Sequence, residues 1–257
     1  MIIWGKQYVR KSQGYVADFC PMCHDVRAFK LVRVGLAGHI YYISLTEGEL
    51  VSYERSCESC GMVFGTEAER YARALKELCP LRELMAQTFP NIATHYAQRF
   101  AVEKALRDPF GKVSPAERTA LIKEPFQILA QRAEERYSAG LVNGASAAAF
   151  IAAICIGGVA SALLEARLGL SSEEQPMLWA GVLVVAAIVA WIFSLWWRHR
   201  WMRKEIVPRL AGALRLLKPT DAEVAAALAD MKALGLRIGS RLKPEAVMAA
   251  LKAAPAG

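Results

Sequence analysis

Six cysteines are the residues of this chain with the most specific chemistry, and four of them form two closely spaced pairs. Cys20 and Cys23 make one CxxC, and Cys57 and Cys60 make a second after 33 intervening residues. Because each CxxC turn places two sulfurs on one side of a metal ion, two turns complete the tetrahedral thiolate set that zinc prefers. We therefore expect these four residues to bind Zn²⁺. Such a closed site leaves no position for a catalytic water, so the zinc should be structural.

The same thiols could instead be redox-active, but no βαβ pattern surrounds them as it does in thioredoxin-like proteins. The N-terminal sequence MIIWGKQYVRK has an apolar run shorter than the about 7–15 residues of a signal-peptide core. We expect this segment to stay in a reducing compartment, where paired cysteines bind metal. Cys79, on a predicted helix, and Cys155, in an apolar segment, are expected to be small apolar fillers.

Strand-forming residues lie between the two cysteine pairs. Segments 29–34, 38–45 and 50–55 are rich in β-branched and aromatic residues, with a predicted turn at 46–48. They predict a small antiparallel sheet whose ends the metal clamps. So short a segment buries too little apolar surface to fold alone, and metal binding would supply the missing stability, on the order of 10 kcal/mol.

At these residues the chain resembles the zinc-ribbon family, and in detail bacterial proteins that carry an apolar Trp-Gly segment, here residues 2–5, before the first CxxC. The resemblance covers about residues 1–65, a quarter of the chain. It implies a ribbon fold with zinc at the four cysteines. It implies no single activity, because ribbons bind nucleic acids or proteins or brace a neighbour. His24 follows the first pair where glycine is usual, and we expect it to be exposed.

Two uncharged segments predict a membrane hairpin. Residues 141–164 would be about 36 Å long as a helix and residues 177–197 about 31 Å, against a hydrocarbon core of about 30 Å. Tryptophans at both ends of the second segment suit the membrane interface. The alternative is a pair of helices buried in a soluble core, which a chain of this size rarely provides.

Basic residues give the orientation of this hairpin. The loop 165–176 contains one, Arg167, whereas nine lie within 20 residues outside the hairpin. By the positive-inside rule, both termini should be cytoplasmic, at the inner membrane of a bacterium. Neither segment contains Asp, Glu, Lys, Arg or His, which transport through a membrane usually needs. We therefore expect an anchor and not a transporter.

Small residues recur on the first apolar segment. Ala153, Gly157 and Ser161 stand four residues apart, so they share one helical face that a second helix can approach closely. The partner is expected to be the second segment of the same hairpin. A homodimer contact through this face is the alternative.

The remainder is predicted to be helical, which makes the chain an α+β protein. A cytoplasmic region at residues 66–137 starts with the capping-box sequence from Thr66 to Glu69, whose helix should run to Cys79. Further helices are expected at 81–88, at 92–107 and from Ser114, with an interruption at Pro125. Residues 198–257 should hold a basic helix bent near Pro208 and two short helices, starting at Thr220 and Pro244.

The basic surplus after the second apolar segment would lie along the inner leaflet, its cations near phospholipid headgroups. The expected membrane-surface residues are Arg198, Arg200, Arg203, Lys204 and Arg209. With a net charge of +8, a nucleic-acid-binding strip is the alternative.

No hydrolase, kinase, Rossmann or P-loop signature occurs in the sequence, and we expect no enzymatic activity. The favoured hypothesis is an interaction or scaffold protein that binds a protein partner at the cytoplasmic membrane face. Membrane-tethered nucleic-acid binding is the second hypothesis, and a thiol redox sensor is the third.

Overall fold

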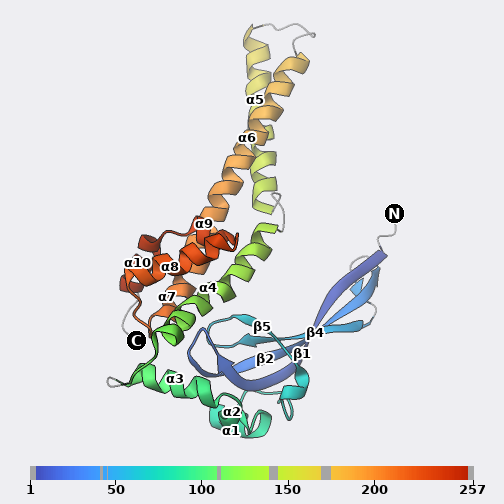
Figure 1. Ribbon diagram of the computed structural model, residues 1–257. Coiled ribbons are helices and arrows are strands. Elements are labelled where there is room, and N and C mark those ends of the chain that lie inside the picture. Colours follow the sequence, from blue (N-terminus) through green and yellow to red (C-terminus); the bar gives the residue numbers. More distant parts are fainter. Residues whose placement is uncertain are drawn as a thin grey trace. The chain divides into compact units, whose positions relative to one another are not determined.

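The computed structural model describes residues 4–40, 43–44, 46–108, 111–138, 144–168 and 175–253. It is a mixed α+β protein in which an N-terminal antiparallel sheet precedes a mostly helical remainder (Figure 1). This confirms the α+β class and the N-terminal antiparallel sheet predicted from the sequence.

The chain forms two compact units, and each contains two separate segments. The first unit comprises Met1–Pro125 and Gly212–Pro219, and the second comprises Phe126–Ala211 and Thr220–Gly257. The first therefore holds the sheet, and the second holds the apolar helices. The short segment after the apolar helices returns to the sheet-containing unit.

The first unit is built on one antiparallel sheet with the strand order β1-β2-β4-β5, to which the two-residue strand β3 adds by pairing with β2. Its strands are β1 Trp4–Cys20, β2 Asp25–Ile40, β3 Ile43–Ser44, β4 Glu49–Cys57 and β5 Val63–Thr66.

The strands are longer than the sequence patterns indicate. β1, with 17 residues, was not expected, and β2 joins two of the expected strands without a break. The two strands pair from Trp4↔Ile40 to Cys20↔Asp25, with one irregularity between Ser12 and Gly14. Alternate residues of the outer half of β1 are exposed, whereas its last seven residues are mostly buried. Half of the strand thus belongs to the core and half extends beyond it.

The helix predicted from Thr66 to Cys79 is wrong. Thr66 ends β5, a single 3₁₀ turn follows at Ala68–Arg70, and Cys79 lies in irregular structure before the next helix. Contacts with other parts of the fold take the place of the capping hydrogen bonds that were expected between Thr66 and Glu69. The Thr66 hydroxyl lies 3.1 Å from the Tyr71 hydroxyl, and the backbone groups of Leu75 exchange two hydrogen bonds with Tyr15 of β1.

Four helices follow the sheet, and the last of them continues from the first unit into the second. The prediction of a helix at 81–88 is confirmed, and the one at 92–107 is confirmed except for a break at Tyr96. The next helix begins at the predicted start: the Ser114 hydroxyl accepts the Glu117 backbone N–H, and the Glu117 carboxylate accepts the Ser114 N–H. The four helices are α1 Leu81–Thr88, α2 Ile92–His95, α3 Ala97–Arg107 and α4 Pro115–Ser138.

The interruption predicted at Pro125 is absent, because α4 continues through it. Proline inside a helix costs about 3 kcal/mol. Buried apolar side chains on both sides of it offset that cost: Ile122 precedes the proline, and Phe126 and Leu129 follow. Residues 139–143, between α4 and the first apolar segment, lie outside the described residues.

The second unit contains the apolar helices α5 Gly144–Leu168 and α6 Gln175–Trp201, which lie side by side (Figure 1). Within the described residues, one helical stretch is long and apolar enough to cross a membrane, Trp179–Leu214, with a mean hydropathy of 2.2. The apolar part of α5, Ala147–Leu163, is shorter. The loop 169–174 lies outside the described residues.

The chain after α6 stays helical through a wider π turn, η2 Met202–Ile206, into α7 Val207–Leu214. The π turn stands directly before Pro208, whose ring in a regular α-helix would clash with the carbonyl four residues earlier. A wider turn relieves that clash, so the chain stays helical past Pro208, where the sequence predicts a bend.

Three short helices end the chain: the two predicted from Thr220 and Pro244 are confirmed, and a third, which was not predicted, lies between them. Thr220 makes both hydrogen bonds of a capping box with Glu223, and Gly235 has a positive φ of 74° beyond the helix end. Such a glycine provides the left-handed residue at which helices commonly stop. The helices are α8 Asp221–Ala233, α9 Arg237–Arg241 and α10 Pro244–Ala253.

Candidate metal centre

Two turns of the sheet bring the four cysteines together. Cys20 is the last residue of β1, and Cys23 lies in the tight turn that leads into β2. Cys57 is the last residue of β4, and Cys60 lies in the turn before β5. Since Phe29 of β2 pairs with Cys57 of β4, both turns emerge at the same end of the sheet.

The spacing of the sulfurs fits one metal ion. All four Sγ atoms lie within 4.8 Å of one another, with 3.7 Å between Cys20 and Cys60 and 4.0 Å between Cys23 and Cys57. Four sulfurs at about 2.3 Å from a tetrahedral ion would be about 3.8 Å apart, whereas a disulfide bond is about 2.05 Å long. All six cysteines are free thiols. The cluster therefore has the geometry of a metal site and not of a disulfide.

The thiols also act on one another electrostatically. Hydrogen bonding from Cys20 lowers the pKa of Cys60 to about 7 and moves the pKa of Cys57 well below its ordinary value. The hydrogen bond with Cys23 raises the pKa of Cys20. Thiolate, not thiol, is the form that binds metals. The lowered pKa values of Cys57 and Cys60 therefore favour metal binding at neutral pH.

The two cysteine turns share one backbone feature. The residue after each CxxC has a positive φ, 53° at His24 and 68° at Gly61. Glycine adopts this left-handed conformation without strain, as Gly61 does here. A histidine there has a strain energy of about 1–3 kcal/mol, so its side chain must make contacts that compensate.

His24 makes those contacts in the interior, and the expectation that it is exposed is wrong. Only 3% of its surface is accessible. Its Nδ1 lies 2.9 Å from Oε1 of Glu103 on α3, and its Nε2 donates to the carbonyl oxygen of Ala213 at 2.8 Å. The side chain of Arg107 donates to the His24 carbonyl. The first cysteine turn is thus tied to α3 and to the end of α7.

Glu103 is itself almost fully buried and carries a charge. Burial alone would raise its pKa, but the hydrogen bond from His24 and the charge of Arg99, 2.9 Å away, outweigh burial and lower the pKa. Because an ionised carboxylate only accepts hydrogen bonds, Oε1 of Glu103 is the acceptor in its contact with the His24 ring. The guanidinium of Arg99 also pairs with Glu124 at 2.7 Å.

A second buried carboxylate, Asp18, lies two residues before the first cysteine. Its two oxygens accept hydrogen bonds from the hydroxyls of Tyr71 at 2.6 Å and Tyr96 at 2.8 Å. Arg55 of β4 forms an ion pair with it, and Arg70 lies 3.6 Å away. Burial raises the pKa of Tyr71, so its hydroxyl keeps the proton that it donates. With these partners, Asp18 joins strands β1 and β4 to the segments around Tyr71 and Tyr96.

Sequence reasoning missed this Asp18 network, because its members come from positions far apart in the chain. The only local signal is the alternation in β1, which places Asp18 on the same face as Val16 and Cys20, among buried residues. A charged residue at such a position requires partners, although the sequence does not name them.

The remaining predicted site residues lie in the second unit. Arg200, Arg203 and Lys204 are exposed on α6 and η2, whereas Arg209 forms an ion pair with Glu205 at 2.5 Å. The side chain of Arg198 lies outside the described residues. Cys155 is exposed on α5, in the second unit, and is not a member of the four-cysteine cluster. The cluster is therefore made of the four predicted cysteines alone among the residues described.

No protein-family model, no curated protein and no solved structure matches this chain. The metal centre must accordingly be interpreted from its own chemistry.

Proposed function

We propose that this protein is a membrane-anchored interaction protein, in which a zinc-clamped sheet presents a β-arm to a protein partner at the cytoplasmic face of the inner membrane. The β-arm is the part of the sheet formed by Trp4–Gln13, Val32–Ile40, Ile43–Ser44 and Glu49–Tyr53. This proposal places both termini in the cytoplasm, gives the cysteine site a structural role and assigns no enzymatic activity.

Zinc is the metal that this donor set favours. Four thiolates in tetrahedral array suit Zn²⁺ or an iron–sulfur cluster, and the compact sulfur spacing leaves room for a single ion. The resemblance of residues 1–65 to zinc ribbons supports the same choice. Such an ion would contribute folding energy to the sheet, whose outer half has few buried residues.

The anchoring role rests on the helices α5 and α6. Only 11% of the apolar window of the Trp179–Leu214 stretch is buried, although the core helix of a soluble protein would be mostly buried. Large apolar side chains such as Val184, Val185 and Ile188 are exposed along α6. A lipid environment explains this exposure, since soluble proteins rarely expose so large an apolar surface. The proposal adds α5 as a second span, packed on α6.

Impermeant thiol labelling tests this topology. In a chain whose native cysteines 79 and 155 are replaced by serine, we expect a cysteine introduced at Ser171 to be labelled from outside intact spheroplasts. A cysteine introduced at Ser240 should be labelled only after the membrane is permeabilised. Labelling of both positions in intact spheroplasts, or recovery of the protein as a soluble species without detergent, would reject the two-span anchor.

The observation that carries the interaction role is the open edge of β1. β1 lies at one side of the sheet, and among the described residues no strand pairs with its outer edge between Trp4 and Gln13. Further along the strand the edge is closed, because Tyr15 pairs with Leu75 and the Ala17 N–H donates to the Thr88 hydroxyl at 2.9 Å. Among the described residues, the outer edge of β1 between Trp4 and Gln13 is therefore free of strand pairing.

Side chains of the β-arm are also suited to a protein partner. Trp4 is 80% exposed and Tyr8 is 64% exposed, and Ile43, Leu50 and Val51 are exposed as well. An edge of this kind normally invites aggregation unless a partner or a charge protects it. A partner that adds an extended segment to β1 would gain main-chain hydrogen bonds from the edge and specificity from the aromatic side chains.

Affinity purification of the full chain from solubilised membranes tests this role. We expect specific partners to be recovered with the native protein and lost with a Trp4→Ser/Tyr8→Ser variant. A Leu78→Ser/Leu234→Ser variant is the matched control, because both leucines are exposed and lie outside the β-arm. Equal recovery by all three proteins would remove the β-arm from the interaction.

Nucleic-acid binding is the second candidate, since Trp4, Lys6, Tyr8 and Arg10 alternate aromatic and basic side chains along one face of β1. Two of the basic groups nearby are already paired, Arg10 with Glu54 and Lys11 with Glu47, which weakens the attraction to phosphate. Binding to single-stranded RNA that falls steeply with added salt would favour this candidate. A redox role would require the zinc-loaded cluster to react with mild oxidant.

A further inference from the structure

The end of α6 carries a group of one aromatic and four basic side chains that belongs to neither the metal centre nor the β-arm. These residues line a cavity of about 260 Å³, and we call them the basic groove: Trp196, His199, Arg200, Arg203 and Lys204. Their spacing of three and four residues makes them neighbours on the helix surface, arranged in two adjacent rows. The volume is slightly below the about 300–1,000 Å³ of drug-sized ligand sites, which suits a small headgroup.

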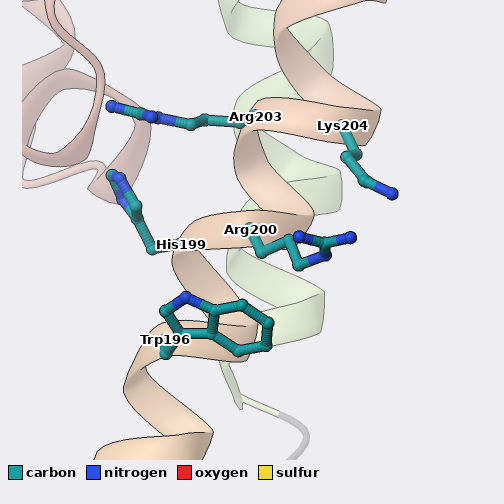
Figure 2. A pocket seen from close by; sticks show the side chains of 5 residues that line it. All are labelled: Trp196, His199, Arg200, Arg203 and Lys204. Atoms are coloured by element: carbon teal, nitrogen blue, oxygen red, sulfur yellow. The ribbon is translucent and has the colours of Figure 1, made fainter.

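The side chains form two rows around this cavity. Figure 2 shows His199 and Arg203 projecting to one side of the helix and Arg200 and Lys204 to the other, with the Trp196 ring beside Arg200. The guanidinium carbon of Arg200 lies 5.2 Å from the centre of the Trp196 ring, a cation–π contact that holds the planar group in place. A held guanidinium loses little freedom when it binds an oxyanion.

The basic groove has positive charge without a partner. Among the described residues, no carboxylate lies within ion-pair distance of Arg200, Arg203 or Lys204, although Arg209, one turn further on, is paired with Glu205 at 2.5 Å. Several cations around one small cavity repel one another unless an anion joins them. Arginine and lysine together favour a phosphate, which accepts several charge-assisted hydrogen bonds.

The position of the groove along the helix indicates the source of that phosphate. Trp196 stands near the end of the apolar part of α6, where indole rings favour the membrane interface. Arg203 follows about 10 Å further along the helix axis, at the depth of headgroups if the ring lies at the interface. Arg203 and Lys204 lie in the π turn η2, and π turns are frequent at functional sites.

We propose that the basic groove binds the phosphate of an anionic phospholipid of the inner leaflet. Arg200 and Lys204 donate to the phosphate oxygens from one row, Arg203 and His199 donate from the other row, and Trp196 lies against the glycerol and the upper acyl chain. This inference rests on the proposed membrane insertion of α6 and specifies the lipid class that holds the protein there. It also divides the predicted membrane-surface residues into two groups. Arg200, Arg203 and Lys204 bind the phosphate, whereas Arg209 is paired with Glu205 and does not.

The test uses the full chain in a neutral detergent, with thermal stability as the readout. Dioctanoyl phosphatidylglycerol, dioctanoyl phosphatidylcholine and inorganic phosphate are titrated separately. We expect the melting temperature to rise with phosphatidylglycerol and to change little with the other two. An Arg200→Gln/Arg203→Gln variant should need at least about tenfold more phosphatidylglycerol for the same rise, since charge-assisted hydrogen bonds are lost.

Controls separate the site from net charge and from folding. A Lys232→Gln/Lys243→Gln variant loses the same charge at exposed positions elsewhere and should respond like the native protein. Lys204→Gln should give a smaller loss than the arginine pair, and each variant's melting temperature without lipid reports on its fold.

Three outcomes would overturn the proposal. An equal response to inorganic phosphate would identify free phosphate as the ligand, and an equal response to phosphatidylcholine would show that no anionic headgroup is selected. A native response of the Arg200→Gln/Arg203→Gln variant would place lipid binding elsewhere. A protein that stays soluble without detergent would instead reject the membrane anchor itself, so the two failures are distinguishable.

Discussion

The imidazole of His24 donates a hydrogen bond from Nε2 to the carbonyl oxygen of Ala213, 189 residues later in the chain, at a distance of 2.8 Å. His24 directly follows Cys23 of the four-cysteine cluster, so this bond links the first cysteine turn to the end of α7. The same ring contacts Glu103 on α3. One side chain therefore connects three separate parts of the first unit.

The His24→Gly variant measures what this connection contributes. Glycine accepts the φ of 53° without strain, so the variant removes the hydrogen bonds and relieves the backbone at the same time. Because two hydrogen bonds to buried groups, one of them charged, are lost, we expect a net destabilisation of about 1–3 kcal/mol. Thermal melting of the metal-loaded protein checks it. A variant as stable as the native protein would show that backbone strain cancels the hydrogen bonds.

Replacing one cysteine of the cluster should release the metal and unfold the sheet. In Cys57→Ser a hydroxyl stands where a thiolate is needed, and the metal-binding energy of the order of 10 kcal/mol is largely lost. Elemental analysis of the purified native chain should find one zinc ion per chain, and close to none in the variant. Cys155→Ser, which changes an exposed thiol outside the cluster, is the matched control and should retain its zinc. A metal-free native protein with a fully folded sheet would contradict the structural role.

Asp18→Asn should be among the most destabilising single changes in the first unit. The variant keeps the shape of the side chain but leaves the buried Arg55 without its counterion. Breaking a buried ion pair from one side costs about 3–5 kcal/mol. The exposed pair of Asp25 with Arg27, 3.3 Å apart, provides the comparison. For Asp25→Asn we expect less than about 1 kcal/mol in the same denaturant titration, and equal effects would refute the structural role of the Asp18 network.

The Glu103→Gln variant should differ from the native protein in how its stability changes with pH, and the direction of this difference can be stated. The pKa of Glu103 is lower in the folded protein, so the carboxylate stabilises the fold above its unfolded-state value of about 4.3. That contribution is lost as the pH falls through the lowered folded-state pKa. At pH 7 the variant should therefore be less stable by about 1–3 kcal/mol, and the difference should shrink below about pH 4. Metal loss in acid affects both proteins alike, and a difference that grows in acid would contradict the assignment.

Two glycines of the apolar hairpin offer a matched test of helix packing. A Cβ at Gly157 of α5 would lie 2.6 Å from a methyl carbon of Val182 on α6, whereas a Cβ at Gly181 would meet nothing within 4 Å. Gly157→Ala should therefore lower the melting temperature in detergent. Gly181→Ala should leave it unchanged or raise it, because alanine favours helix. Equal effects of the two changes would mean that the small-residue face of α5 does not pack on α6.

The parts of the structure that depend on short sequence spacing could be predicted. Three kinds of feature could be recognised from residues a few positions apart. They are the two cysteine pairs, the helix starts at Ser114 and Thr220, and the apolar segments. In each of these places the local preference and the tertiary structure agree.

The errors arise where distant contacts override a local pattern. The capping-box sequence at Thr66 starts no helix, because the backbone groups of Leu75 pair with Tyr15 and the Thr66 hydroxyl contacts Tyr71. His24 was expected on the surface because nothing near it in sequence reveals Glu103 or Ala213. The partners of Asp18 are equally remote. A single sequence shows which residues need partners but not which partners they have.

The discontinuous make-up of the first unit has a consequence for biosynthesis. Ala213 emerges from the ribosome after both apolar helices, and at about 5–20 residues per second the 189-residue interval lasts roughly 10–40 s. During that time the nascent N-terminal sheet has its cysteines but lacks the carbonyl that His24 needs. The proposed hairpin thus emerges before this unit can close, so its insertion into a membrane would precede completion of the first unit.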